Sequence, residues 1–477
     1  MTYPNTDLFI DGSWRPSASG ETMPVLDPAT GAEIGRMAKA DQSDLDAALE
    51  AARIAYPLWN DTPVVNRSAL MRKAADLLRA RADEIAGIMT AEHGKPLVQA
   101  RLEILASADV IDWFAEESRR TYGQVIPARM KGVTQLTVKD GVGPVAAFSP
   151  WNFPINQVVR KVAAALAAGC SIIVKTPSET PASPAAMIRC FADAGLPAGV
   201  LNLVMGDSSM ISTHLITHPV IKKISFTGST PVGKKLAGLA GEHMKRATME
   251  LGGHAPVLVF DDANIELAAQ TLAATKFRNA GQICTSPTRF LVQRSAADAF
   301  IEIFVEATKA LKVGPGTEPS VDMGPLINDR AVDTMESMVA DATQHGGRVL
   351  CGGKRMGNSG FFFEPTVLAD VPVEARIMND EPFGPIAVIN RFDADDEAFA
   401  EANRLPFGLA SYAWTTSSAR QQRLQDEVQA GMLSVNHVGL ALPELPFGGI
   451  GDSGIGTEGG SEAIEAYLQT RFITRKD

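Results

Sequence analysis

Cysteine is scarce in this chain, and the spacing of the few cysteines excludes the common cysteine-based scaffolds. Only four occur among 477 residues, namely Cys170, Cys190, Cys284 and Cys351, and no two of them form a CxxC pair. A disulfide framework needs paired cysteines, and a structural zinc site needs closely spaced ligands. The sequence therefore predicts neither, and no metal site is expected. A reducing, cytoplasmic location fits this pattern best.

Long apolar runs are also missing. The longest, residues 162–174, is rich in alanine and is interrupted by Gly169 and Ser171. It is shorter than the roughly 20 residues that cross a bilayer. The N-terminus, MTYPNTDLFIDGSW, has neither the basic nor the apolar segment of a secretory signal. We therefore expect no association with a membrane.

Positive charge is in deficit. Lysine and arginine number 44 against 55 aspartates and glutamates, which gives a formal net charge of -11, and no long basic run occurs. Such a surface repels a phosphate backbone, so nucleic acid is not an expected partner. Hydrophobic residues at 45% and charged residues at 21% are typical of a globular protein. A chain of this length suits two or three domains.

Short apolar runs alternate with helical segments over most of the chain. Residues 41–120 show a helical pattern that begins at Asp41 or Ser43 and breaks at Gly94. Beyond Gly141 the pattern changes to short predicted strands and helices. The strands are 144–149, 171–175, 199–205 and 221–228, and the helices are 154–169, 181–195 and 229–241. This alternation predicts a doubly wound α/β domain with a parallel sheet, which binds ligands beyond the carboxyl ends of its strands.

A second series of the same kind begins near Glu250. It has strands at 255–260 and 288–293, a helix from 264 to 280, and another helix that ends near Leu311. We therefore place a domain boundary near Glu250. The sequence shows no internal repeat, low-complexity tract or long linker.

Three segments place a reactive side chain within a rigid bend. They are FSPWNFP (148–154), MELGGHAP (249–256) and NAGQICTSPTRF (279–290). Their reactive members are Asn152, Glu250 and Cys284, the last at the end of a predicted helix. Taken singly, each has an ordinary interpretation, as a turn-capping asparagine, a surface carboxylate and a buried inert thiol. The argument for chemistry therefore depends on their occurring together.

Together the segments resemble the aldehyde dehydrogenase superfamily, and the resemblance covers essentially the whole chain. The family's motifs occur in order as PWNFP, KTPSETP, FTGSTPVG, MELGG, GQICT, EPFGP (381–385) and PFGG (446–449). The chain looks most similar to the NAD(P)-dependent succinate-semialdehyde dehydrogenases. The resemblance implies an α/β fold of two doubly wound Rossmann-like domains with a small oligomerisation β-arm.

The resemblance also implies a division of the chain. Residues 1–120 and 139–249 would form the NAD(P)-binding domain, and residues 250–440 the catalytic domain that carries the nucleophilic cysteine. Residues 121–138 and 461–477 would form the arm, and residues 441–460 a returning segment. Because such an arm pairs across subunits, a homodimer or a homotetramer is expected.

The same resemblance assigns the catalytic roles. Cys284, as a thiolate, attacks the aldehyde carbon and later carries a thioester. The side-chain amide of Asn152 and the backbone N–H of Cys284 stabilise the oxyanion. Glu250 activates the water that releases the carboxylic acid. The small-molecule substrate is therefore an aldehyde.

Cofactor-binding residues follow from the matching positions. They are Trp151, Lys175, Ser178, Phe226, Gly228, Ser229, Val232, Leu251, Glu381 and Phe383. Residues 226–229 should open a helix whose N-terminus meets the pyrophosphate. Lys175 and Ser178 should face the adenosine ribose, where strictly NAD-dependent members often carry a glutamate that repels a 2′-phosphate. With serine at that position NADP should be accepted, and the preference between NAD and NADP stays open.

The substrate positions are Phe153, Arg160, Arg278 and Phe447. Arg160 and Arg278 resemble the pair that grips the distal carboxylate in succinate-semialdehyde dehydrogenases. The alternative is two helix-surface arginines in ion pairs. Residues 440–442 (LAL) replace the serine expected before PFGG, which predicts a more apolar tunnel mouth suited to a longer or aromatic semialdehyde. The group's second cysteine is Ser286 here, so no disulfide switch is expected.

Three other functions stay open at this point. One is a broad aliphatic and aromatic aldehyde dehydrogenase. Another is a non-catalytic structural protein of the same fold, against which the intact set of Asn152, Glu250 and Cys284 argues. The third is a thiol hydrolase, which would need a histidine beside the thiol, with His254 and His437 as candidates.

Overall fold

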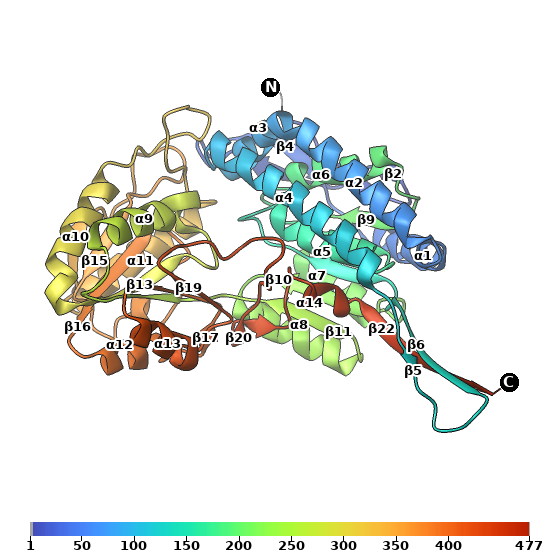
Figure 1. The fold of residues 1–477 in the computed structure, drawn as a ribbon. Coiled ribbons are helices and arrows are strands. Elements are labelled where there is room, and N and C mark those ends of the chain that lie inside the picture. Colours follow the sequence, from blue (N-terminus) through green and yellow to red (C-terminus); the bar gives the residue numbers. More distant parts are fainter. Residues whose placement is uncertain (1–2, 477) are drawn as a thin grey trace.

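The computed structural model describes residues 3–476 and has two lobes with a projecting arm (Figure 1). Each lobe is built on one large sheet, and the helices of each lobe pack against that sheet over separate apolar cores. Among the described residues, no helix has the length and apolar character that a membrane span requires. The α/β fold expected from the sequence is confirmed.

The first lobe contains an eight-stranded sheet whose central strands are parallel. Its order is β2 (Ser13–Arg15), β1 (Leu8–Ile10), β9 (Leu201–Val204), β8 (Ile172–Lys175), β7 (Val145–Phe148), β10 (Lys223–Thr227), β11 (Arg246–Glu250) and β21 (Gly454–Ile455). Strands β9 to β11 are parallel neighbours, and β1, β2 and β21 pair antiparallel at the edges. The strand order reverses between β7 and β10, which is where a doubly wound sheet binds its ligand.

Helices cover both faces of this sheet. Those of the α/β repeats are α5 (Asn156–Ala167), α6 (Ala182–Ala194), α7 (Ser208–Thr217) and α8 (Thr230–Glu242). The N-terminal helices are α1 (Gln42–Asn60), α2 (Val64–Ala80), α3 (Ala82–His93) and α4 (Leu97–Glu117), after the hairpin β3 (Thr22–Leu26) and β4 (Glu33–Ala38). Asp41 caps α1 by accepting the Asp44 N–H, and Gly94 ends α3 at φ 86°. Both predicted boundaries are therefore confirmed.

The second lobe contains a seven-stranded sheet. Its order is β14 (Arg348–Cys351), β15 (Thr366–Ala369), β16 (Ile386–Phe392), β13 (Pro287–Gln293), β12 (Ala255–Val259), β18 (Ala410–Trp414) and β19 (Met432–Val435). All neighbours are parallel except β14. Its helices are α9 (Ile265–Phe277), α10 (Arg294–Lys309), α11 (Asp329–Gln344), α12 (Asp395–Ala402) and α13 (Ser418–Glu427).

One predicted helix of this lobe is confirmed, but its C-terminal limit is wrong. The helix expected over 264–280 ends at Phe277, and Asn279 and Ala280 adopt φ of 51° and 54°. The chain turns there because it packs tightly against the loop before β16, where a Cβ on Gly281 would lie 2.2 Å from the Gly384 carbonyl oxygen. Arg278 therefore does not share a helix with Cys284. The residues from 278 onward form a tight irregular turn.

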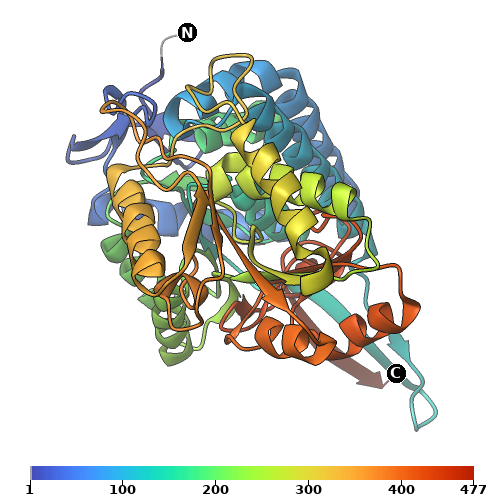
Figure 2. The same cartoon turned by 90° about the vertical axis from the view of Figure 1, so that its left-hand side faces the viewer.

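The arm is a three-stranded antiparallel sheet of β5 (Val125–Ile126), β6 (Val133–Gly141) and β22 (Leu468–Lys476). It projects from the first lobe in both views, with the C-terminal strand beside the hairpin (Figure 2). Strand β6 runs to Gly141, past the expected limit at 138. The C-terminal strand starts at Leu468, because α14 (Glu462–Glu465) occupies the preceding residues.

The last part of the chain returns from the second lobe to the first. Strand β21 pairs with β11, with Gly454 opposite Glu250. Ser453 Oγ donates to the Gly252 carbonyl at 2.7 Å and accepts the Gly408 N–H at 3.0 Å, while its own carbonyl accepts the Leu251 N–H at 2.9 Å. The returning segment therefore binds the strand end that carries Glu250.

Candidate active site

The candidate site lies where the carboxyl ends of the strands in the first sheet meet the amino ends of the strands in the second. Asn152 follows β7 and Glu250 ends β11, so both lie at carboxyl ends in the first sheet. Cys284 precedes β13 and Glu381 precedes β16, so both lie at amino ends in the second. Asn152 Nδ2 donates to the Gln282 carbonyl at 3.1 Å, and a Cβ on Gly253 would lie 2.9 Å from the Cys284 carbonyl oxygen. The three predicted motifs are therefore brought together.

The backbone of Asn152 is fixed by hydrogen bonds from two other residues. Its carbonyl accepts hydrogen bonds from Lys95 Nζ at 2.8 Å and Asn279 Nδ2 at 3.0 Å, and the residue is 2% exposed. One amide hydrogen is directed to Gln282. A side-chain amide carries two N–H donors, so the second is left for another acceptor.

Glu250 is a buried carboxyl without a hydrogen-bond partner. It is 2% exposed, and neither carboxyl oxygen is bonded within residues 3–476. Burial raises its pKa well above the usual range, Glu458 raises it further, and Lys161 and Arg160 lower it. Because an unsatisfied buried carboxyl costs folding free energy, its presence at this place indicates a functional group.

Cys284 lines a cavity of about 330 Å³. Burial raises the pKa of its thiol to about 12, and the carboxyls of Glu381 and Glu250 act in the same direction. The backbone N–H groups of Cys284 and Thr285 lower that pKa, because they point towards the sulfur. The resting group is therefore a thiol, with two backbone donors close to it.

The start of α8 is open to an anion. Ser229 is the N-cap of α8, and its side chain makes no capping hydrogen bond. A Cβ on Gly228 would meet the Phe226 ring at 2.5 Å, and one on Gly233 would meet Leu251 at 2.1 Å. Phe226 and Leu251 are buried beneath this helix start, while Val232 on its first turn is exposed. Free N–H groups at a helix N-terminus fit a pyrophosphate.

Aromatic rings line the neighbouring part of the site. Trp151 contacts Phe383 edge to face at 5.6 Å between ring centroids. His93, which is fully buried, lies on another side of the same indole at 5.8 Å. Trp151 and Phe383, expected from different motifs to contact one cofactor, therefore lie side by side.

The residues expected at the adenosine ribose lie at the end of β8. Lys175 Nζ donates to Ser208 Oγ at 2.8 Å, and Ser178 lines a smaller cavity of about 170 Å³. Burial lowers the pKa of Lys175, while Glu179 and Asp207 raise it. Sequence reasoning missed Glu179, which lines the cavity beside Ser178. Its position directly after Ser178 was the available signal.

Glu381 faces a buried lysine that sequence reasoning also missed. Burial raises the pKa of Glu381 to about 8, and the Gly253 backbone N–H and Lys276 lower it. Lys276 is fully buried in the last turn of α9, and its Nζ donates to Ser286 Oγ at 3.2 Å. Burial lowers the pKa of Lys276 to about 7, while Glu381 raises it, so each of these two buried groups favours the charged form of the other.

The cavity beside Cys284 contains the expected substrate residues, and its lining includes Phe153, Arg160, Arg278 and Phe447. Arg160 is buried, and its guanidinium donates hydrogen bonds to acceptors of the protein itself. Its Nε donates to Asn156 Oδ1 at 3.1 Å, its Nη2 to the Ala441 carbonyl at 3.2 Å and its Nη1 to the Glu458 carbonyl at 3.4 Å. Arg278 is exposed, lies 5.9 Å from the centre of the Phe153 ring, and has no ion pair among residues 3–476. The two arginines are therefore not equivalent, and neither is an ion-paired surface arginine.

A buried charged group lies behind Glu250. Lys161 is paired with Glu458 and donates to Thr227 Oγ1 at 2.6 Å, while Ser225 Oγ donates to Glu458 at 2.9 Å. Lys161 lies in the sequence next to Arg160 but gave no motif of its own. Glu458 is remote in the sequence, and no signal pointed to it.

Neither histidine expected for a thiol hydrolase lines the cavity that contains Cys284. His254 is fully buried, and its two ring nitrogens contact Thr288 Oγ1 and the Ile377 carbonyl. His437 is exposed, and its Nδ1 accepts the Gly439 N–H at 3.2 Å. Over residues 3–476, no three histidine, cysteine, aspartate or glutamate side chains are grouped to hold a metal ion.

Known proteins are similar to this chain over most of its length. The model of the "Aldehyde dehydrogenase family" matches residues 14–473. A 4-(hydroxymethyl)benzenesulfonate dehydrogenase of Comamonas testosteroni is 44% identical, over 99% of this chain and 98% of its own. Mitochondrial succinate-semialdehyde dehydrogenase of Mus musculus is 43% identical, over 98% and 90%. The 3-sulfolactaldehyde dehydrogenase of Pseudomonas putida is 40% identical, over 98% and 96%.

Solved structures agree with the fold. Succinate-semialdehyde dehydrogenase from Burkholderia pseudomallei matches with a TM-score of 0.97 at 40% identity, covering 99% of this chain and 98% of that one. An NADP-dependent enzyme of E. coli matches with a TM-score of 0.97 at 38% identity, with the same coverage. The chain therefore belongs to the aldehyde dehydrogenase family, and it is an oxidoreductase that oxidises aldehydes with NAD(P).

Proposed function

We propose that this enzyme oxidises an aldehyde with an anionic tail, such as succinate semialdehyde, to the carboxylic acid through a Cys284 thioester. One observation carries the proposal: a single cavity holds the Cys284 thiol and the guanidinium of Arg278, which has no ion pair among residues 3–476. The names of the relatives support it. Succinate semialdehyde carries a carboxylate, and 3-sulfolactaldehyde and 4-(hydroxymethyl)benzenesulfonate carry a sulfonate.

In this proposal Arg278 binds the tail alone. Arg160 shapes the cavity wall, because its donors are already committed to Asn156, Ala441 and Glu458. The sequence-based pair of equal arginines is thus reduced to one anion-binding arginine and one wall residue. Phe153 and Phe447 form the apolar part of the wall.

Catalysis begins with deprotonation of Cys284. Because the pKa of the thiol is raised to about 12, a base must accept its proton. Glu250 has two unbonded oxygens and serves as this base in its ionised form. Attack of the sulfur on the aldehyde carbon creates an oxyanion. The free N–H of the Asn152 amide and the backbone N–H of Cys284 stabilise it, each contributing on the order of 3 kcal/mol.

The remaining steps use the same residues. Bound NAD(P) supplies the hydride acceptor, and the open start of α8, Glu381 and Phe383 would hold it. The residue left on Cys284 is a thioester. Glu250 first releases to solvent the proton that it took from Cys284. It then takes a proton from water, and the hydroxide attacks the thioester carbonyl. The C–S bond breaks, and the sulfur regains a proton from Glu250 as the acid leaves.

We propose that NADP is accepted as well as NAD. Ser178 removes the carboxylate that would repel a 2′-phosphate, and Lys175 supplies a cation nearby. Glu179 and Asp207 act on that cation and weaken its attraction for the phosphate. Measured values of kcat/KM for both cofactors test this, and a thousandfold preference for NAD would contradict it.

An aromatic substrate is a second candidate for the same site. The cavity lining includes Leu102, Ala106 and Ala441, and Leu102 is exposed. These side chains can pack on a benzene ring between the thiol and Arg278. A panel that includes 4-sulfobenzaldehyde and 4-carboxybenzaldehyde beside succinate semialdehyde distinguishes the two candidates by kcat/KM.

The arm has the features of a surface that pairs with another subunit. The arm carries exposed apolar residues, among them Val125 and Phe472, and β5 leaves an open sheet edge that can pair with another subunit. We propose a homodimer or homotetramer formed through it, which light scattering would measure. We propose that the catalytic domain begins at residue 250. We also propose a cytoplasmic location, because all four cysteines are free.

The decisive experiment tests Arg278. Arg278→Ala should raise KM for succinate semialdehyde by roughly 10- to 100-fold, since a charge-assisted contact is worth about 1.5–3 kcal/mol. The methyl ester of succinate semialdehyde is the matched uncharged substrate, and its KM should change little. Equal increases for both substrates would contradict an anion-binding role.

A further inference from the structure

Two charged side chains outside the proposed catalytic set lie directly beneath Asn152. Lys95 and Glu103 are 2% and 5% exposed, and Lys95 Nζ lies 2.7 Å from Glu103 Oε2. Lys95 follows the end of α3 and Glu103 lies on α4, so neither belongs to the strand and turn that carry Asn152. Apolar residues of similar volume often replace a buried ion pair without loss of stability. This pair therefore requires an explanation beyond stability.

The pair binds both ends of the turn that contains Asn152. Lys95 Nζ donates to the Asn152 carbonyl at 2.8 Å. Glu103 Oε1 accepts the backbone N–H groups of Ile155 at 3.0 Å and Asn156 at 3.1 Å. The turn leading from β7 into α5 is thus fixed at its beginning and at its end by one ion pair.

The carboxylate also completes α5. The N-cap of α5 is Ile155, whose side chain cannot accept a hydrogen bond from the first turn. Glu103 supplies an acceptor and a negative charge to that helix start from a different helix. The ammonium lies 4.4 Å from the centre of the Phe153 ring. The carboxylate therefore acts on the start of α5, and the ammonium acts on the Phe153 ring and the Asn152 carbonyl.

The consequence falls on the amide of Asn152. Its backbone is fixed by Lys95 and Asn279, and its side chain is aimed by one hydrogen bond to the Gln282 carbonyl, two residues before Cys284. A shift of the turn would lengthen that bond and move the free N–H away from the oxyanion. Preorganised donors act only when they are held at the correct place.

We propose that the Lys95–Glu103 ion pair is a positioning device for the Asn152 oxyanion donor. It rests on the proposed role of Asn152. Loss of the pair should slow formation of the oxyanion through Asn152, and it should leave cofactor binding unchanged. Lys95 and Glu103 have a positioning role in this proposal, since their polar atoms are bonded to each other and to the turn that carries Asn152.

A double-mutant cycle tests the proposal. Glu103→Gln, Asn152→Ala and the double variant are compared by the single-turnover rate of NAD(P)H formation. Asn152→Ala should slow this rate by roughly 10²- to 10³-fold, and Glu103→Gln should slow it by about tenfold. The double variant should be no slower than Asn152→Ala alone, because the donor that Glu103 positions is then absent.

The outcomes separate the two proposals. If Asn152→Ala slows turnover but the Glu103→Gln effect multiplies with it, the positioning role is overturned and the oxyanion role stands. An unchanged rate in Glu103→Gln overturns the positioning role equally. An unchanged rate in Asn152→Ala overturns both. A raised cofactor Kd in Glu103→Gln, measured by NAD(P)H fluorescence, places the effect elsewhere and also counts against the proposal.

Two further variants guard against a simple loss of folding. The combination Lys95→Met with Glu103→Gln removes both charges, leaves no isolated buried ion, and should enter the cycle with the same result. Asp44→Asn is the matched control, since Asp44 is fully buried, paired with Arg15 at 2.8 Å and remote from the cavity. It should lower the unfolding midpoint without slowing the single turnover. A slowed turnover in Asp44→Asn would show that buried carboxyls act on the rate through stability, and would overturn the proposal.

Discussion

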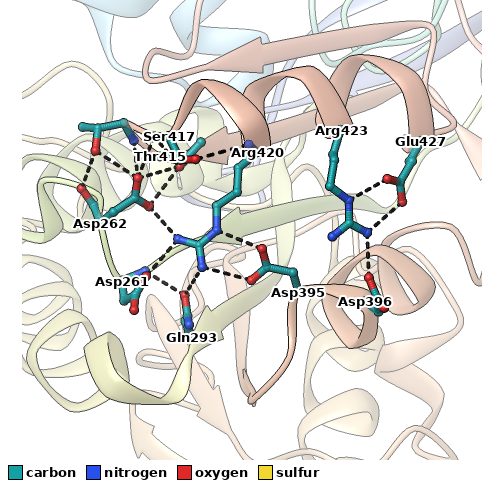
Figure 3. A network of polar contacts seen from close by, with 11 residues as sticks. Asp261, Asp262, Gln293, Asp395, Asp396, Thr415, Ser417, Arg420, Arg423 and Glu427 are labelled. Carbon is teal, nitrogen blue, oxygen red and sulfur yellow. Dashed lines mark hydrogen bonds and ion pairs between the residues drawn. The ribbon is translucent and has the colours of Figure 1, made fainter.

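The carboxyl ends of the two parallel sheets differ in whether their carboxyl groups have bonding partners. In the second lobe, Arg420 on α13 binds Asp261 and Asp262 beyond β12 and Asp395 beyond β16, each at 2.9 Å (Figure 3). Asp262 also accepts the N–H groups of Thr416 at 2.8 Å and Ser417 at 2.7 Å. In the first lobe, both oxygens of Glu250 and Oδ1 of Asn152 have no partner within residues 3–476.

The difference teaches where to look for chemistry in a doubly wound fold. The rule that ligands bind beyond the carboxyl ends of parallel strands fits the first sheet. At the carboxyl ends of the second sheet, the charged side chains are paired with one another, and no site is open within residues 3–476. The amino ends of that sheet supply Cys284 and Glu381. A buried carboxyl without a hydrogen-bond partner therefore distinguishes the carboxyl end of the first sheet from that of the second better than topology does.

The largest expected effect is at the candidate active site. Cys284→Ala removes the nucleophile, so NAD(P)H formation from an aldehyde should fall by roughly 10⁴-fold or more. The unfolding midpoint should change little, because the side chain borders a cavity. Absorbance after aldehyde addition and a denaturant titration measure the two quantities. Undiminished turnover in this variant would sink the thioester route.

Glu250→Gln should give the next largest effect. In the proposed mechanism Glu250 accepts the proton of Cys284 as well as that of water, so NAD(P)H formation should slow by about 10²- to 10³-fold without a preceding burst. The raised pKa of Glu250 means that folding favours the neutral carboxyl, and this contribution is lost as pH rises through the interval between the unfolded and folded pKa values. Glutamine stays neutral, so the variant should be no less stable near neutral pH. Lower stability would contradict the comparison.

Arg420→Ala tests the carboxyl ends of the second sheet. It leaves Asp261, Asp262 and Asp395 facing one another without their cation, and should lower the free energy of unfolding by about 3 kcal/mol. Activity at a permissive temperature should be unchanged. The control is Arg423→Ala, whose exposed pairs with Asp396 and Glu427 are worth about 0–1 kcal/mol. A variant that loses activity but no stability would reverse the assignment of the two carboxyl ends.

The smallest effect expected is the acid dependence at the carboxyl ends of the second sheet. Thr415, Thr416 and Ser417 lower the pKa of Asp262 to about 2, although burial opposes them. A lowered pKa contributes stability above the unfolded pKa, and this is lost as pH falls from about 4 towards 2. Asp262→Asn should therefore be less stable than the parent by about 2 kcal/mol near neutral pH, with the gap narrowing in acid. A constant gap in denaturant titrations over that range would contradict this account.

The sequence allowed the parallel sheets and the Asn152, Glu250 and Cys284 motifs to be predicted, because strand periodicity and rigid turns are local properties. The turn at Asn279 could not be predicted, since it depends on close packing of Gly281 against Gly384. The commitment of Arg160 to the Ala441 and Glu458 carbonyls joins residues remote in the sequence. No local motif marked Lys95, Glu103 or Glu458, because each contacts its partners through tertiary structure.

The pairing of β21 with β11 has a mechanical consequence. A strand delivered by the second lobe is hydrogen-bonded beside the residue that ends β11, and Ser453 ties the following bend to Gly252 and Gly408. A movement that separates the two lobes would break these hydrogen bonds. It would also move Glu250, the proposed base, away from Cys284. We therefore expect the two lobes to stay closed during turnover, with the substrate entering through the cavity beside Cys284.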